Sequence, residues 1–153
     1  MKRIEVRLAV PMVAPLLDVI RELAEGLEAN LAAPLALADL DAEFREAWVG
    51  ELLEAQNAEV ATLLALFNED FFHEGVVAFD EDNADVIVRA CAAVRLRLRQ
   101  CYLKPLGDEL LETGEVDPRR LDEPTRRAFM CYLFLATLQE LIIKHLDQSI
   151  LEG

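Results

Sequence analysis

The sequence predicts a mainly α protein: a single-domain helical bundle over residues 1–153, built around a central C-terminal helix, with a short N-terminal strand. Three observations support this. Helical steps of three and four residues dominate the apolar pattern, only two short runs alternate with period two, and residues 128–138 are apolar on nearly every helical face. The length of 153 residues and the hydrophobic fraction of 54% suffice for one buried core and exclude a disordered chain.

A half-buried strand is predicted over residues 4–10, where apolar side chains recur at every second position. These side chains are Ile4, Val6, Leu8 and Val10. A strand needs a partner strand, and the predicted partner is the short apolar run of residues 75–79 between turn-forming residues. The alternative partner is the edge of a second copy of the chain.

The first helix is predicted from about residue 13, where the apolar period changes to steps of three and four through Leu31. Pro11 and Pro15 fit only near its start, and Pro34 ends it.

The second helix is predicted over residues 41–67, and it breaks at Asn68. Six side chains mark its expected buried stripe: Phe44, Trp48, Leu52, Val60, Leu63 and Phe67. A helical turn through Phe71 and Phe72 is expected before the second strand.

The third helix is predicted to begin at a cap formed by Asp82 or Asn83 and to end before Pro105. Its first half, residues 84–94, is almost entirely small or β-branched, which permits close approach by a neighbouring helix. A polar connection with one helical turn follows over residues 106–116.

The last helix is predicted to be the central helix of the fold, against which the other elements pack. Asp122 caps it, Pro124 is tolerated in its first turn, and it continues to about Leu146 or beyond. Because its middle is apolar all round, we expect neighbouring elements to surround it.

Charge is distributed unevenly along the chain. The formal net charge is −14, and residues 8–88 carry 18 acidic but two basic side chains. Such a surface opposes the binding of a phosphate backbone, so we expect no nucleic-acid partner. It favours either a solvated acidic face with ion pairs inside the fold or the recruitment of a basic protein partner.

Residues 1–7 place charged side chains where a secretory signal needs an apolar run, so we expect a cytoplasmic protein. The longest charge-free stretch, residues 128–139, is short for a membrane span, so no membrane partner is expected. The cysteines, Cys91, Cys101 and Cys131, form no CxxC pair and are predicted to be buried, inert thiols.

One spacing resembles half of a metal site. Asp70 and His73 stand three residues apart, as in a carboxylate-bridged helical bundle, and Glu69 adds a second acid. His145, the other histidine, has Leu141 and Ile142 at the matching upstream positions, so the second half is missing. A metal-binding or enzymatic bundle centred on Asp70 and His73 is therefore the alternative hypothesis.

Other catalytic patterns are missing from the sequence. No GxSxG, GxxxxGK[ST] or GxGxxG segment occurs, and no residue is predicted to be catalytic or to bind a metal or cofactor. The chain is expected not to be an enzyme. Of the arginines at positions 95, 97 and 99, only Arg95 and Arg99 share a helical face, and both are candidate interaction positions.

The segment from Cys91 to Arg99, Cys-Ala-Ala-Val-Arg-Leu-Arg-Leu-Arg, resembles the helical Leu-Asn-x-x-Arg-Leu-x-Leu-Gly element of an uncharacterised bacterial domain of unknown function. Tyr132 with Leu138-Gln139-Glu140 is similar to the Tyr and Leu-Gln-Glu element of that family's final helix. The gene of this family commonly neighbours that of the protease adaptor ClpS.

The resemblance implies a mainly helical fold and a connection with regulated proteolysis, but no mechanism. It points to Arg95, Gln139 and Glu140 as positions to mutate. An arginine and a glutamate on two core helices would also form an ion pair of purely structural role, and that is the favoured interpretation.

The leading hypothesis is therefore a non-enzymatic interaction protein, without cofactor, acting through a helical surface as an accessory factor in cytoplasmic proteolysis. Its predicted partners are a second copy of itself and either a basic protein or a proteolysis adaptor. The apolar excess predicts a homodimer through the C-terminal helix, from Leu141 to Leu151, or through the edge of the N-terminal strand.

Overall fold

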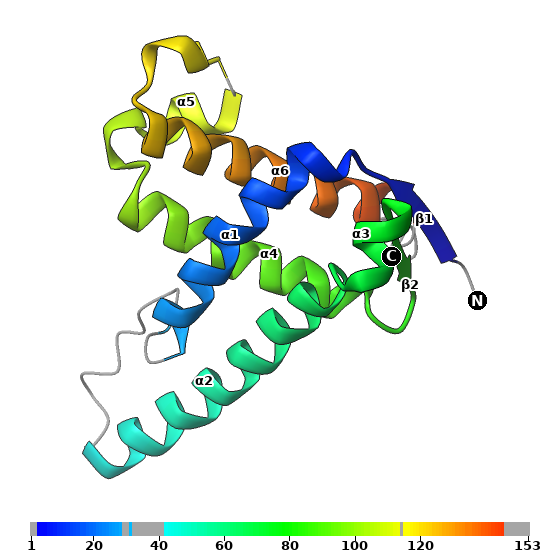
Figure 1. The fold of residues 1–153 in the computed structure, drawn as a ribbon. Helices are drawn as coiled ribbons and strands as arrows, with labels where there is room; N and C mark the ends of the chain where they lie inside the picture. Colours follow the sequence, from blue (N-terminus) through cyan, green and yellow to red (C-terminus); the bar gives the residue numbers. More distant parts are fainter. Residues whose placement is uncertain (1–2, 29–30, 32–41, 114, 146–153) are drawn as a thin grey trace.

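Helices α4 and α6 share the centre of the fold, and the other elements surround them (Figure 1). The computed structural model describes residues 3–28, 31, 42–113 and 115–145. α4 (Ala84–Cys101) packs against α1 (Val10–Leu27), α2 (Ala42–Ala65) and α6 (Glu123–His145), while α6 also packs against α1. The predicted mainly α architecture is confirmed.

The two predicted strands pair with each other. β1 (Arg3–Arg7) lies antiparallel to β2 (Val76–Asp80), with Arg3 opposite Asp80 and Arg7 opposite Val76. The even-numbered apolar residues of β1 are partly buried against the core, and its odd-numbered charged residues are exposed. β1 is shorter than predicted because α1 already begins at Val10.

A short helix, α3 (Glu69–Glu74), leads into β2 as the predicted helical turn. Asn68 caps it by accepting a hydrogen bond from the Phe71 N–H at 3.1 Å. Gly75 follows with φ of 71°, and a Cβ there would lie 2.9 Å from the Leu8 carbonyl oxygen. Glycine therefore permits the tight turn that brings β2 alongside β1.

α1 ends at Leu27, one turn before the predicted Leu31. The amide side chain of Gln56 donates to the Leu27 carbonyl at 3.0 Å, and that of Asn57 donates to the Glu28 carbonyl at 3.2 Å. These α2 side chains satisfy carbonyls at the end of α1, so the helix can end there. Leu31 lies outside the helix, and the predicted breaker Pro34 lies outside the described residues.

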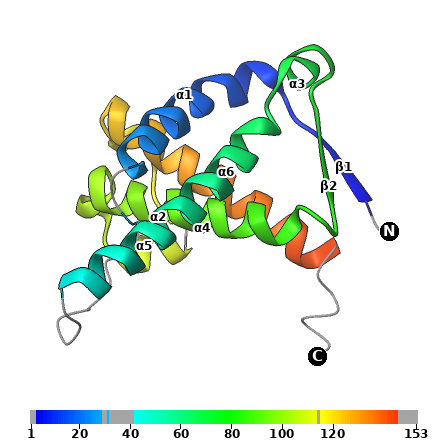
Figure 2. The same ribbon diagram turned by 90° about the horizontal axis from the view of Figure 1, so that it is seen from below.

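The predicted buried stripe of α2 is only half right. Val60, Leu63 and Phe67 are buried, but Phe44 is 64% exposed and Trp48 51% exposed. The N-terminal half of α2 extends beyond the rest of the fold, away from the strands (Figures 1 and 2). The end of α1 contacts α2 near its midpoint, through Gln56, and most side chains from residue 43 to residue 51 are exposed.

α6 supplies much of the core, but the prediction that neighbouring elements surround it is wrong, because one face is exposed. Phe129, Leu135 and Leu138 are almost fully buried, whereas Met130 is 41% exposed and Leu133 is also exposed. α1 and α4 cover its other faces. By length and composition alone α6 could cross a membrane, but a core helix of a soluble protein meets the same criterion.

Three short helices connect α4 to α6: η1 (Lys104–Leu106), α5 (Asp108–Thr113) and η2 (Pro118–Arg120). α4 ends before Pro105, as predicted. Asp122 caps α6, as predicted, by accepting from the Thr125 N–H at 2.9 Å. Asn83 holds the position before α4, but its side chain accepts from the Asp80 N–H and so stabilises the turn after β2 instead.

Candidate interaction surface

Arg95 forms a polar network between the two central helices. From α4, its Nη1 donates to Gln139 Oε1 at 2.6 Å and its Nη2 donates to the Tyr132 hydroxyl at 3.0 Å. Its Cζ lies 4.4 Å from the centre of the Tyr132 ring, within range of a cation–π interaction. Gln139 Nε2 in turn donates to the Val88 carbonyl at 2.9 Å, so the network returns to α4.

The predicted ion pair between Arg95 and Glu140 is wrong. Glu140 is exposed, whereas Gln139 is buried. Among the described residues no ion pair includes Arg95, and its Nε atom is buried without a hydrogen-bond partner. Tyr132 and Gln139 are seven residues apart and therefore share a face of α6, while Glu140 is turned away by about 100°.

The other arginines of α4 differ in their surroundings. Arg89 forms an ion pair with Glu59 of α2 at 3.1 Å. Arg97 lies against α1, where a Cβ added to Gly26 would be 3.5 Å from its guanidinium. Arg99 is partly buried one turn after Arg95 and is not among the residues that contact the Arg95 guanidinium.

Two of the three cysteines fit the predicted inert type. Burial raises the pKa of Cys91 to about 12, partly opposed by the charge of Arg95, and burial raises the pKa of Cys131 to about 12 as well. Neither thiol ionises near neutral pH, so neither is suited to act as a nucleophile. Cys101 corrects the prediction, because it is exposed at the end of α4.

Asp70 and His73 are not brought into one site. Both are exposed on α3, and Asp70 faces a hollow of about 660 Å³ whose described lining does not include His73. In residues 3–28, 31, 42–113 and 115–145, no group of three His, Cys, Asp or Glu side chains is arranged to hold a metal ion. The geometry therefore gives the metal-site alternative no support.

The hollow itself was not predicted. Its polar lining comes from the exposed face of β1 and from the segment around α3: Arg3, Glu5, Arg7, Asn68, Asp70 and Glu74. The side chains of Arg3 and Glu5 form an ion pair at 3.5 Å, and both are more than half exposed. The alternation of charged and apolar residues from 3 to 7 was the available signal, because it places three charges on one face.

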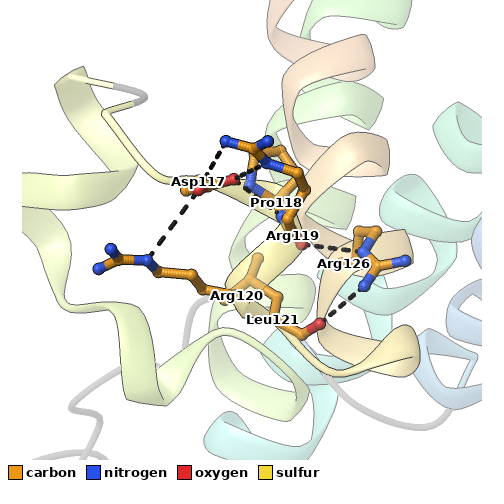
Figure 3. A network of polar contacts seen from close by, with 6 residues as sticks. All are labelled: Asp117, Pro118, Arg119, Arg120, Leu121 and Arg126. Atoms are coloured by element: carbon orange, nitrogen blue, oxygen red, sulfur yellow. Dashed lines mark hydrogen bonds and ion pairs between the residues drawn. The ribbon is translucent and has the colours of Figure 1, made fainter.

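A cluster of arginines lies between α5 and α6 (Figure 3). Asp117 Oδ1 accepts from Arg119 N and Nε at 3.0 and 3.1 Å, which holds the pKa of Asp117 below its ordinary value. Arg126 donates to the Pro118 and Leu121 carbonyls at 2.9 and 3.0 Å. These contacts fix the conformation of the turn that precedes α6, so the role of these arginines is structural.

The exposed N-terminal half of α2, residues 43–55, is here called the α2 arm. Phe44 and Trp48 lie one turn apart on one face of it, and Glu51 continues that face toward the body of the protein. The described side chains of the arm include four acids and one base: Glu43, Glu46, Glu51, Glu54 and Arg45. The arm thus combines large exposed aromatics with negative charge.

A comparison with protein families identifies a match for most of the chain. A family described as a domain of unknown function, DUF2017, matches residues 29–146. The matched range contains the α2 arm, α4 and α6, whereas β1 and α1 precede it. Searches of curated proteins and of solved structures found no match.

Proposed function

Because the chain belongs to the DUF2017 family, whose function is unknown, we propose its function from its own surface: it is a non-enzymatic interaction protein. The α2 arm docks a basic, amphipathic segment of another protein. The observation that carries this proposal is the exposure of Phe44 and Trp48 on a helix that extends beyond its packing partners (Figure 2). Exposed aromatic side chains are typical anchors of protein interfaces.

The charge of the arm defines the chemistry of the partner. Apolar side chains of the partner cover Phe44 and Trp48, and its lysines or arginines face Glu43, Glu51 and Glu54. Much of this attraction acts between exposed charges, so binding weakens as the salt concentration rises.

Affinity capture from the native host at low and high salt tests this proposal. The wild-type chain is compared with the Phe44→Ala, Trp48→Ala double variant and with a matched control, Met12→Ala, which removes an exposed apolar side chain from α1. The double variant is expected to lose the captured protein, and the control to keep it. Equal capture by the double variant would show that the α2 arm is not the docking surface.

The captured protein is then titrated against the purified chain. Trp48 is the one tryptophan in the sequence, so its fluorescence reports directly on the arm. Docking moves an exposed indole into apolar surroundings, and a blue shift of its emission is expected. Binding without any change in this emission would contradict docking at Trp48.

A narrower proposal is that the docked protein belongs to the cytoplasmic proteolytic machinery. It rests on the resemblance to a family whose gene commonly neighbours that of the protease adaptor ClpS, since the DUF2017 match itself names no function. Protease subunits or an adaptor among the proteins lost from the double variant would support it. Capture of proteins unrelated to proteolysis would leave the arm as a docking surface and remove the proteolytic role.

A further inference from the structure

β1 presents an open strand edge. In the described part of the chain the sheet consists of β1 and β2, and β1 lies at the periphery of the fold (Figure 2). The Leu8 N–H donates to the Gly75 carbonyl at 2.7 Å, which continues the register of the pair. Because ladder hydrogen bonds alternate along an antiparallel strand, the main-chain groups of Glu5 and Arg7 point away from β2. Another strand can bond to them.

A hollow of about 360 Å³ lies beside this edge. Its described lining consists of the consecutive residues 4–7 of β1 with Leu141 and His145 of α6, and no β2 residue contributes. The hollow is therefore on the open side of β1. Ile4, Val6 and Leu141 make part of its wall apolar, so it has room for the apolar side chains of an added strand.

We propose that the β1 edge pairs antiparallel with β1 of a second copy of this chain, with Val6 on the two-fold axis. Glu5 of each copy then faces Arg7 of the other. On the opposite face Ile4 of each copy faces Leu8 of the other, beside the apolar hollow. The two-stranded sheets join into one four-stranded sheet, and opposite charges and apolar side chains pair across it.

The charge and apolar patterns together select this register over its neighbours. Centring the pair on Glu5 would place two Glu5 side chains opposite each other and Arg3 opposite Arg7, which is repulsive. Centring it on Ile4 would also pair opposite charges, Glu5 with Arg3, but would lose the two apolar contacts between Ile4 and Leu8. In the Val6-centred pair no like charges meet. Arg7 forms no ion pair with any described residue of its own chain. In the proposed dimer it faces the Glu5 carboxylate of the other copy.

Other features of the chain also favour β1 over the C-terminal helix as the contact. Ile142, an expected interface residue of that helix, is 1% exposed and belongs to the chain's own core. Leu146, Ile150 and Leu151 lie outside the described residues. With a net charge of −14, two copies repel each other least where residues 1–7 carry three basic side chains and one acid.

Sedimentation at micromolar concentration, with circular dichroism to verify folding, tests the proposal. The wild type is expected at twice the 17.2 kDa mass of one chain. Glu5→Arg alone and Arg7→Glu alone each place like charges opposite one another twice, and each should raise the dissociation constant on the order of tenfold or more. An equimolar mixture of the two variants should dimerise again, because every reversed charge then faces its opposite.

The matched control is Glu81→Arg, which makes the same change in net charge as Glu5→Arg at an exposed position just beyond β2. It should remain dimeric. A wild-type monomer at both low and high salt overturns the proposal, as does a mixture of folded variants that fails to restore the dimer. A monomeric full chain that dimerises only when ended at His145 would show that residues 146–153 occupy the edge, which also overturns it.

The α2 arm and the β1 edge lie at opposite ends of the molecule (Figure 1). Variants at one are therefore not expected to affect the other, and the failure of either proposal leaves the other standing.

Discussion

Both halves of α2 carry apolar side chains at helical steps of three or four residues, but their surroundings differ. In the C-terminal half, Val60 and Leu63 are buried, and Phe67 just after the helix is buried as well. In the N-terminal half, Phe44 and Trp48 are mostly exposed. The change occurs near Gln56, whose side chain bonds to the last residue of α1. A hydrophobic stripe predicts which face of a helix is apolar, but burial of that face requires another element opposite it.

This difference explains why the projecting half is a functional candidate and the packed half is not. Large side chains in the packed half stabilise the chain by leaving water. Phe44 and Trp48 of the α2 arm are 64% and 51% exposed, so a partner that covers them would remove further apolar surface from water. Substitutions in the packed half should therefore lower stability, whereas substitutions in the arm should lower binding.

The largest expected effect is a difference in the rate at which thiols react. Like α2, α4 has a buried part and an exposed part. Cys91 is fully buried and Cys101 is exposed at the end of the helix. With a disulfide reagent at pH 8, we expect one fast equivalent per native chain, from Cys101. Cys91 and Cys131 should react only after an opening that costs on the order of 5 kcal/mol or more, so their labelling should be slower by at least a thousandfold.

Cys101→Ser is the control, and it should remove the fast equivalent. All three thiols should react at once in denaturant. Two or more fast equivalents in the native wild type would show that the packing around Cys91 or Cys131 opens readily.

The second prediction compares the buried end of the α2 segment, at Phe67, with the α2 arm. Phe67→Ala removes a buried ring that packs edge-on against Phe71 at 5.2 Å between ring centres. We expect the free energy of unfolding to fall by about 3–5 kcal/mol, because a cavity is left. Trp48→Ala in the arm should change it by less than about 0.5 kcal/mol. Urea unfolding measures both, and a large loss in Trp48→Ala would place the arm within the cooperative core.

Much of the fold could be predicted from local pattern. The strand pair, the end of α4 before Pro105 and the Asp122 cap follow from alternation, proline sterics and capping chemistry, which act within a few residues. The exposure of Phe44 and the early end of α1 could not be predicted in this way. Both depend on which residues of another helix lie opposite, and a single helical period does not contain that information.

The interior network was predicted only in part. The sequence singled out Arg95, Gln139 and Glu140 together, and the ion pair predicted from charge joined Arg95 to Glu140, whereas the structure joins Arg95 to Gln139. The seven-residue spacing of Tyr132 and Gln139 would have indicated their common face, and with it the neutral partners. Opposite charge alone therefore does not identify the partner of a buried arginine, whereas position around the helix does.

The third prediction concerns this network, which lies in the packed part of the fold. Arg95→Met keeps much of the side-chain volume but removes the donors to Gln139 and Tyr132. Because Gln139 is buried, its unpaired oxygen should lower the free energy of unfolding by about 1–3 kcal/mol. Arg89→Ala, which breaks an exposed ion pair with Glu59, should cost about 0–1 kcal/mol. Equal stability of Arg95→Met and the wild type would show that the cost of desolvating the guanidinium cancels its hydrogen bonds.

The smallest effect is expected at the exposed turn before α6, the counterpart of the buried network. The Thr125 hydroxyl and N–H hold the pKa of Asp122 below its ordinary value of 3.8, and Arg126 adds to this. The native state then keeps this carboxylate ionised at a pH where the unfolded chain takes up a proton. Its contribution to stability is therefore complete above the unfolded pKa and is lost as the pH falls through the native pKa.

Asp122→Asn separates this titration from the capping itself, since asparagine caps a helix about as well as aspartate but carries no charge. Urea unfolding at pH 7 should give similar stabilities for the wild type and the variant. As the pH is lowered from 5 to 3, the wild type should lose more of its free energy of unfolding than Asp122→Asn does, because only the wild type protonates at this position. Asp117, whose pKa is lowered mainly by Arg119, titrates in both chains and so cancels from the comparison. Parallel curves for the two chains would mean that the charge of Asp122 adds nothing to its cap, and that this turn is held by neutral hydrogen bonds alone.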